Sequence, residues 1–234
     1  MDKLFDDLIN STVYINYKFK INFLIANICK FMNYYIKKNK IKRVIVIGDS
    51  PVIFSKINKL FWDETKDFKD IELLYMEVSN LRSCVGCNKK LRDELQEKIP
   101  LDKKILWIDF VASGNSFLYL YNSMSKKLID KSLFYLYGYS LLENSAIDKL
   151  LSKLYKNNKL YYFTVNNSIE ETFLGDIIGL SEYYKIRCTK YNDFIKTKKI
   201  KLTKKLPQLD TYCDKLSKYF YKKFKNNKGM YRII

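Results

Sequence analysis

The stretch that decides the fold is residues 103–117, KKILWIDFVASGNSF. A charged start leads into an apolar run, the run reaches Asp109, and a short Ser-Gly-Asn-Ser turn precedes a second apolar run. This order predicts a buried strand, a tight loop and a helix. Such a junction places backbone N–H groups at the positive end of a helix dipole, where phosphate binds. We therefore expect an anion site beside a carboxylate at the end of this strand.

The same order of strand and helix repeats on both sides of this stretch. Apolar runs of strand length occupy residues 43–48, 71–78, 105–109, 132–138 and 160–165. Helical patterns occupy residues 51–62, 87–98, 116–126, 144–156 and 169–184. Strands separated by single helices predict an α/β fold with a doubly wound, mostly parallel sheet. In such sheets ligands bind outside the carboxyl ends of the strands.

Helical additions are expected at both ends of this core. An N-terminal helical segment covers residues 1–40, the α/β core residues 41–195, and a basic C-terminal segment residues 196–234. Within the first segment, residues 20–38 carry a helical apolar stripe, and residues 12–19 are open between strand and helix. The last segment contains an amphipathic helix with apolar residues on one face, namely Leu209, Cys213, Leu216, Phe220 and Phe224.

Charge is concentrated near the C-terminal end. The net charge of the 234 residues is +18, and residues 194–234 hold 13 Lys/Arg against two acids, a balance of +11. A basic segment of this kind indicates contact with nucleic acid, anionic lipid or a polyanionic substrate. The alternative is that the lysines form a solvated helix face.

Histidine is absent, which excludes Ser-His-Asp and Cys-His catalysis, histidine-ligated zinc and histidine proton shuttles. The five cysteines are an odd number, and the first residues do not have the pattern of an export signal. We therefore expect a reducing, cytoplasmic location. The longest apolar stretch, residues 23–29, is far too short to span a bilayer, so no membrane span is expected.

The sequence ILWIDFVASGNSF resembles the phosphoribosyl-diphosphate-binding motif of the type I phosphoribosyltransferases. In that family an apolar strand ends in two acids, followed by small or apolar residues and a Thr-Gly-x-Thr turn. Here Asp109 takes the second acid, and Ser113, Gly114, Asn115 and Ser116 take the turn. The resemblance implies that the turn holds the 5′-phosphate and that Asp109 lies near the ribose hydroxyls and Mg²⁺.

The family also has an earlier loop that holds the pyrophosphate with backbone amides. Gly48, Asp49 and Ser50 occupy that place, and the resemblance covers roughly residues 40–140 in order and spacing. A mobile loop usually covers the site in this family. The segment between Ser79 and Lys90 could serve here, because it contains three basic residues, Arg82, Lys89 and Lys90.

Three positions depart from the family pattern. Ile108 stands where the first acid is expected, and Ala112 stands where some purine-specific members carry an acid near the base. Asp49 brings a negative charge into the loop implied to hold pyrophosphate. The structural alternative for both loops is an ordinary helix start, because Ser and Asn are preferred caps and Pro51 suits a first turn.

Two further short motifs are interpreted without a catalytic role. Gly48-Asp49-Ser50 resembles the nucleophile block of GDSL-type esterases, which this chain cannot be, because those enzymes need a histidine base. Cys84 and Cys87 form a single CxxC pair. A structural zinc site needs four ligands, so we interpret the pair as incidental cysteines of the covering segment, with thioredoxin-like chemistry as the alternative.

These observations lead to two functional hypotheses. The first is a phosphoribosyltransferase-like protein that binds phosphoribosyl diphosphate or a related phosphorylated ribose, with Mg²⁺ held through the diphosphate. Its implied reaction transfers the phosphoribosyl group to a nitrogenous base. The second is a non-catalytic protein of the same fold, whose basic segment 196–234 binds nucleic acid or a protein partner. The sequence leaves open the base, the position of the hood that recognises it, and the oligomeric state.

Overall fold

A computed structural model describes residues 2–48, 51–77, 87–111, 114–139, 145–165, 201–203 and 210–226. The strands in these ranges are β1 (Arg43–Ile47), β2 (Glu72–Glu77), β3 (Ile105–Val111), β4 (Ser132–Tyr139), β5 (Leu160–Val165) and β6 (Lys201–Thr203). The helices are α1 (Asp2–Ile9), α2 (Thr12–Asn39), α3 (Val52–Glu64), α4 (Cys87–Lys98), α5 (Asn115–Ser123), α6 (Lys126–Lys131), α7 (Ser145–Lys156) and α10 (Asp210–Asn226). The helix predicted over residues 169–184 lies outside the described ranges.

The six strands form one sheet in the order β5-β4-β3-β1-β2-β6. Strands β1 to β5 run parallel, and β6 pairs antiparallel with β2. The prediction of an α/β fold with a mostly parallel sheet is confirmed. The sequence does not predict β6, because residues 196–205 are rich in lysine. A short strand that carries lysine is nevertheless typical of a sheet edge.

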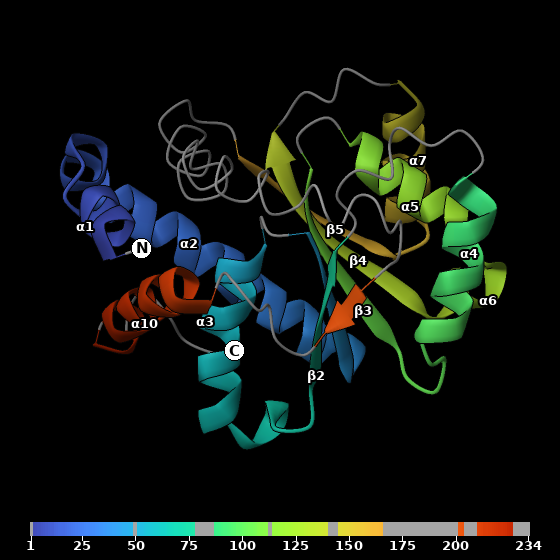
Figure 1. The fold of residues 1–234 in the computed structure, drawn as a ribbon, viewed down its shortest axis with the longest axis horizontal. Helices are drawn as coiled ribbons and strands as arrows, with labels where there is room; N and C mark the ends of the chain where they lie inside the picture. The colour runs from blue at the N-terminus through green and yellow to red at the C-terminus, as the bar shows by residue number, and fades with distance from the viewer. Residues whose placement is uncertain are drawn as a thin grey trace.

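Helices cover both faces of the sheet, with α1, α2, α3 and α10 on one side and α4 to α7 on the other (Figure 1). Every residue of β1 is buried, as in a strand covered on both faces. Its side chains alternate between two cores: Val44 and Val46 face α2 and α3, whereas Ile45 and Ile47 face α4 and α5. The sheet therefore separates two apolar cores.

Helix α2 begins at Thr12, before the apolar pattern of residues 20–38 that predicts a helix. The side chain of Ser11 caps the helix by accepting a hydrogen bond from the Tyr14 amide at 3.1 Å. Tyr14 is buried, and its hydroxyl donates to Asn22 at 3.0 Å and lies 3.1 Å from the hydroxyl of Tyr219 on α10. Residues 12–19 are therefore helical, and contacts with a distant helix stabilise their position.

The helix predicted over residues 116–126 is divided in the structure. Helix α5 ends at Ser123, and Met124 is extended. The side chain of Ser125 then caps α6 by accepting a hydrogen bond from the Leu128 amide at 3.3 Å. A single serine cap within a run of helix-forming residues is enough to start a new helix.

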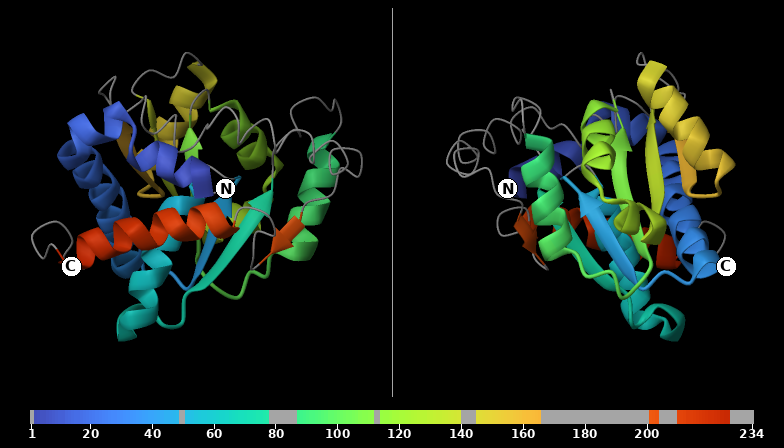
Figure 2. Two further views of the ribbon diagram at one scale, coloured as in Figure 1. Left: turned by 60° about the vertical axis from the view of Figure 1, so that its left-hand side comes forward. Right: turned by 90° about the vertical axis from the view of Figure 1, so that its right-hand side faces the viewer.

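The predicted amphipathic helix is α10, which lies against α3 and α1 (Figure 2). Leu216, Phe220 and Phe224 are fully buried in the core under this face of the sheet. Two ion pairs join α10 to α3, namely Lys56–Asp214 and Lys225–Glu64. This helix is therefore part of the folded core, and its lysines are exposed.

Candidate functional site

The two loops that the sequence singles out leave neighbouring strands. β1 pairs with β3, with Ile45 opposite Trp107 and Val46 opposite Ile108. Because β2 lies beyond β1 and β4 lies beyond β3, the order of strands reverses between β1 and β3. Ligands of open α/β sheets bind outside the carboxyl ends of the strands at such a reversal. The loops after β1 and β3 therefore both begin at the position where this fold binds ligands.

Asp109 lies two residues before the end of β3 and is 8% exposed. Trp107 and Val111 belong to the core under α4 to α7, so the alternation of the strand directs Asp109 toward the same face as α5. Burial raises the pKa of Tyr137 on β4 well above its usual value, and the charge of Asp109 raises it further. A mostly buried carboxylate thus lies at the carboxyl end of β3, on the side where α5 begins.

Ile108 faces the opposite core and is fully buried. Its partners in the sheet are Val46 on β1 and Tyr135 on β4, which are also fully buried. An acid at this position would lie among apolar side chains under α2 and α3. The end of β3 therefore supplies one carboxylate where the family pattern has two.

The turn after β3 requires a glycine for two reasons. Gly114 is at the N-cap position of α5 with a φ of 74°, a left-handed conformation. A Cβ there would also lie 2.3 Å from Cδ1 of Ile147 on α7. Gly114 makes no side-chain cap, and the first turn of α5 carries no acid, so an anion would meet only the positive end of the helix dipole. Asn115 and Ser116 form the start of α5, and Ser113 lies outside the described residues.

The turn after β1 also begins with a left-handed glycine. Gly48 has a φ of 66°, and its amide donates to the carbonyl of Met76 on β2 at 2.8 Å. No atom lies within 4 Å of the position a Cβ would take. The first turn of α3 carries no acid, and Pro51 at its N-cap makes no side-chain cap. Asp49 and Ser50 lie outside the described residues, so their expected role stays a prediction.

Strand β4 adds a close backbone approach that the sequence analysis does not single out. A Cβ on Gly138 would lie 2.1 Å from the carbonyl oxygen of Val111 and 3.1 Å from the hydroxyl of Tyr162. Burial raises the pKa of Tyr162 to about 12, and the charge of Asp148 on α7 contributes. The signal in the sequence is a glycine inside the aromatic run SLFYLYGY, because glycine within a strand often marks close backbone contact.

The segment expected to cover the site lies largely outside the described residues, which resume at Cys87, the first residue of α4. Lys89 is exposed on this helix, and only the backbone of Lys90 is described. Arg82 and Cys84 fall outside the described ranges, so the covering role and the CxxC pair stay predictions.

Within the described ranges, no group of three or more Cys, Asp or Glu side chains is arranged to hold a metal ion. Among the described residues at the carboxyl end of β3, Asp109 is the expected ligand of such an ion. That donor set fits a Mg²⁺ ion held mainly by phosphate oxygens, as Mg²⁺ often is. None of the helices in the described ranges has both the length and the apolar character needed to cross a membrane.

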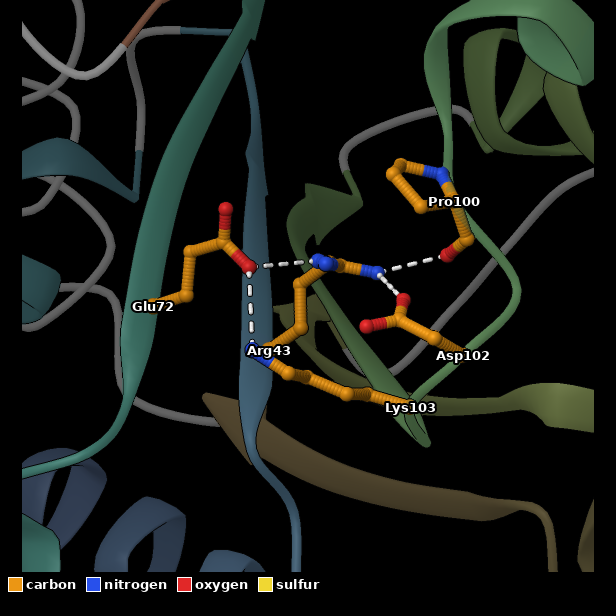
Figure 3. Close-up of polar contacts among 5 residues, drawn as sticks. All are labelled: Arg43, Glu72, Pro100, Asp102 and Lys103. Atoms are coloured by element: carbon orange, nitrogen blue, oxygen red, sulfur yellow. Dashed lines mark hydrogen bonds and ion pairs between the residues drawn. The ribbon is translucent and has the colours of Figure 1, made fainter.

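A second polar cluster lies at the amino ends of the strands, opposite the candidate site (Figure 3). Arg43, at the start of β1, is 3% exposed and donates to Glu72 at 2.8 Å and to Asp102 at 2.8 Å. It also donates to the carbonyl of Pro100 at 2.5 Å. Lys103 lies 3.7 Å from Glu72. This cluster joins β1, β2 and the turn before β3, and it contributes to stability far from the candidate site.

Comparison with known proteins gives no further assignment. No family model, no curated protein and no solved structure matches this chain. The resemblance to the type I phosphoribosyltransferases therefore depends on the residues of the chain itself.

Proposed function

We propose that this protein binds phosphoribosyl diphosphate, or a related phosphorylated ribose, in the manner of a type I phosphoribosyltransferase. The observation that carries the proposal is the pairing of β1 with β3. Gly48 and Asp109, which precede the two loops, therefore lie at the reversal in the order of the described strands. Ligands of open α/β sheets bind at such a reversal, so both loops could contact one ligand there.

The chemistry of the two loops suits the two ends of this ligand. The 5′-phosphate would bind the backbone N–H groups at the start of α5, where neither a cap side chain nor an acid competes. The diphosphate would lie beside the loop that begins at Gly48, on the N-terminal side of α3. Asp109, two residues before the end of β3, would accept hydrogen bonds from the ribose hydroxyls.

The reaction implied by the resemblance exchanges diphosphate for a nitrogenous base at the anomeric carbon. Positioning of the two reactants would supply most of the rate enhancement, together with donors directed at the departing diphosphate. Mg²⁺, when bound with the diphosphate, neutralises part of its negative charge. Asp109 would orient the ribose and share the ion.

The direct test is thermal and urea unfolding with phosphoribosyl diphosphate and Mg²⁺ for wild type, Asp109→Asn and Asp70→Asn. Asp70 is the matched control, because its side chain is 81% exposed at the opposite edge of the sheet. At a ligand concentration of 100 times Kd, we expect about 2.7 kcal/mol of stabilisation for wild type and Asp70→Asn. Asp109→Asn should lose most of it. Equal responses of all three proteins, or none, would exclude this ligand site.

The non-catalytic alternative has one observation in its favour. Ile108 lies in an apolar core, so the end of β3 offers a single carboxylate. On α10, Lys218 and Lys222 are exposed and could contact nucleic-acid phosphates. Removing the C-terminal segment would not test this, because Phe220 and Phe224 are fully buried in the core.

The informative variant is Lys218→Gln/Lys222→Gln, which keeps the buried face of α10. If the helix binds single-stranded nucleic acid, the negative slope of log K against log salt should become shallower. The change should be about 0.7 for each phosphate that the variant can no longer neutralise. An unchanged slope would show that Lys218 and Lys222 do not contact the phosphates of the nucleic acid. Stabilisation by phosphoribosyl diphosphate is measured on the same variant and should not change.

A further inference from the structure

Helix α2 carries an unusual solvent face. Ile15 is 60% exposed, Phe19 72% and Phe23 51%, at intervals of four residues along the helix. The rings of Phe19 and Phe23 lie nearly parallel, with centroids 6.5 Å apart. Beyond Asn27, which is half-buried, Phe31 and Tyr34 are 37% and 40% exposed. We call these five residues the α2 stripe; large apolar side chains in contiguous exposed rows usually mark a contact surface.

The charge around the stripe has one sign. α2 contains no Asp or Glu over its 28 residues and contains five lysines. Lys18 and Lys20 are exposed beside Phe19, and Lys30 is half-buried beside Phe31. Whatever covers the stripe must therefore be apolar and acidic. A second copy of α2 would meet it with the same positive charge, which is unfavourable.

One segment of the chain has the complementary composition. Residues 160–184 contain no lysine or arginine, although these make up 43 of the 234 residues. Within them, residues 166–184, NNSIEETFLGDIIGLSEYY, carry four acids. The apolar residues of this segment recur at helical spacing, namely Ile169, Phe173, Ile177 and Leu180. The sequence thus provides an acidic amphipathic partner inside a strongly basic protein.

The described residues place β5, the strand that precedes this segment, beside the C-terminal half of α2. α2 ends four residues before β1 begins, and both Phe31 and Tyr35 contact Tyr161 on β5, with centroid distances of 5.8 and 5.9 Å. Two residues further along β5, Phe163 contacts Phe31 at 6.3 Å. The strand thus advances toward the N-terminal half of α2. β5 ends two residues beyond Phe163, at Val165.

The lengths also agree. Residues 169–184 as a helix would be about 24 Å long, the same as the span from Ile15 to Phe31. Residues 185–200 remain to reach β6 at the far edge of the sheet. In an extended conformation these residues span up to about 50 Å. The distance across the sheet from β5 to β6 is five strand spacings, or roughly 24 Å, so the connection is long enough. We propose that residues 166–184 dock on the α2 stripe of the same chain, with their apolar side chains against Phe19 and Phe23 and their acids beside the lysines of α2.

The test uses the full chain with the photo-crosslinker p-benzoyl-phenylalanine in place of Phe19. After irradiation, we expect cross-linked peptides from residues 166–184 within a monomer, at a yield that does not change over a hundredfold dilution. The control has the same group in place of Tyr155, which is 70% exposed on α7 and should give none of these peptides. A yield that rises with concentration in a dimer would overturn the proposal in favour of a second copy. Cross-links only to added phosphatidylserine vesicles or to an oligonucleotide would overturn it in favour of those partners.

A second measurement does not depend on the crosslinker. If the segment covers the stripe, Phe19→Ala/Phe23→Ala should lower Tm by about 4–8 °C. In a chain with Ile169→Ser, Phe173→Ser and Ile177→Ser, the same pair should lower Tm by less than about 1 °C, because the segment no longer docks there. Equal shifts in both backgrounds, or no shift in either, would contradict the proposal.

Discussion

Nε of Arg43 donates to Oε2 of Glu72 at 2.8 Å, and the same two residues are partners in the register of β1 and β2. The ion pair therefore fixes which residues of the two strands lie opposite each other at the amino edge. The same guanidinium also donates to the turn before β3 through Asp102 and Pro100. One buried side chain thus joins three consecutive elements of the sheet.

Replacing Arg43 should reveal this role. Arg43→Lys keeps the charge but cannot donate in three directions from a planar group, so we expect a loss of about 1–3 kcal/mol in the free energy of unfolding. The matched control is Arg92→Lys, because Arg92 is exposed and donates to the carbonyl of Asn122 at 3.3 Å. The control should change stability by less than about 0.5 kcal/mol. Similar losses in the two variants, measured by urea unfolding, would contradict this account.

The same cluster predicts that the free energy of unfolding depends on pH. The hydrogen bond from Arg43 lowers the pKa of Asp102 below its usual value. A lowered pKa in the folded state stabilises the protein fully above the ordinary pKa of about 3.9, and this contribution disappears as pH falls through the lowered value. The stability difference between wild type and Asp102→Asn should therefore shrink between pH 5 and about pH 3. A difference that stays constant over that range would show that Asp102 does not titrate in this way.

The two left-handed glycines should differ in their tolerance of a side chain. Gly48→Ala should cost only backbone strain, about 1 kcal/mol, because nothing lies near its Cβ position. Gly114→Ala adds a clash with Cδ1 of Ile147, so we expect about 2–4 kcal/mol in total. Val has no Cδ1, so Gly114→Ala should cost less in an Ile147→Val background. Unfolding of the four proteins in a double-mutant cycle measures this coupling, and additivity would exclude the contact.

Restoring the missing acid of the motif should damage the fold. Ile108→Asp places a carboxylate between Val46 and Tyr135, which are both fully buried. We expect a loss of at least about 3 kcal/mol, against about 1 kcal/mol for Ile108→Val, measured by circular dichroism during urea unfolding. A stable Ile108→Asp protein whose new carboxyl has an ordinary aspartate pKa would mean that the side chain reaches solvent.

Much of the fold is predictable from the sequence because its strands are short apolar runs between charged helices. RVIVI and ILWID are buried on both faces, and their composition shows it. Strand β6 cannot be found in this way, because an edge strand needs no apolar side chains. The helical structure of residues 12–19 is equally hard to predict from the sequence. It is stabilised in part by the contact between Tyr14 and Tyr219, which are 205 positions apart.

The sequence predicts where on the sheet the candidate site lies, but not which strands are neighbours there. The sequence shows that Gly48 and Asp109 follow or end strands, so both belong at the carboxyl edge. That the two strands are neighbours depends on the order of the sheet, which local patterns do not specify. Once Asp109 is placed on the α5 side, the alternation of the strand directs Ile108 to the opposite face. The approach of Gly138 to Val111 appears only in three dimensions.

The contact between Tyr14 and Tyr219 has a consequence for synthesis on the ribosome. Chains grow from the N-terminus, and domains generally fold as units. Here the first long helix and the last described helix share one core, and β6 pairs with β2 from an equally late position. A nascent chain therefore exposes the apolar faces of α2 and α3, and one open strand edge, until Phe224 has emerged. Protection of those surfaces by a chaperone would matter most in that interval.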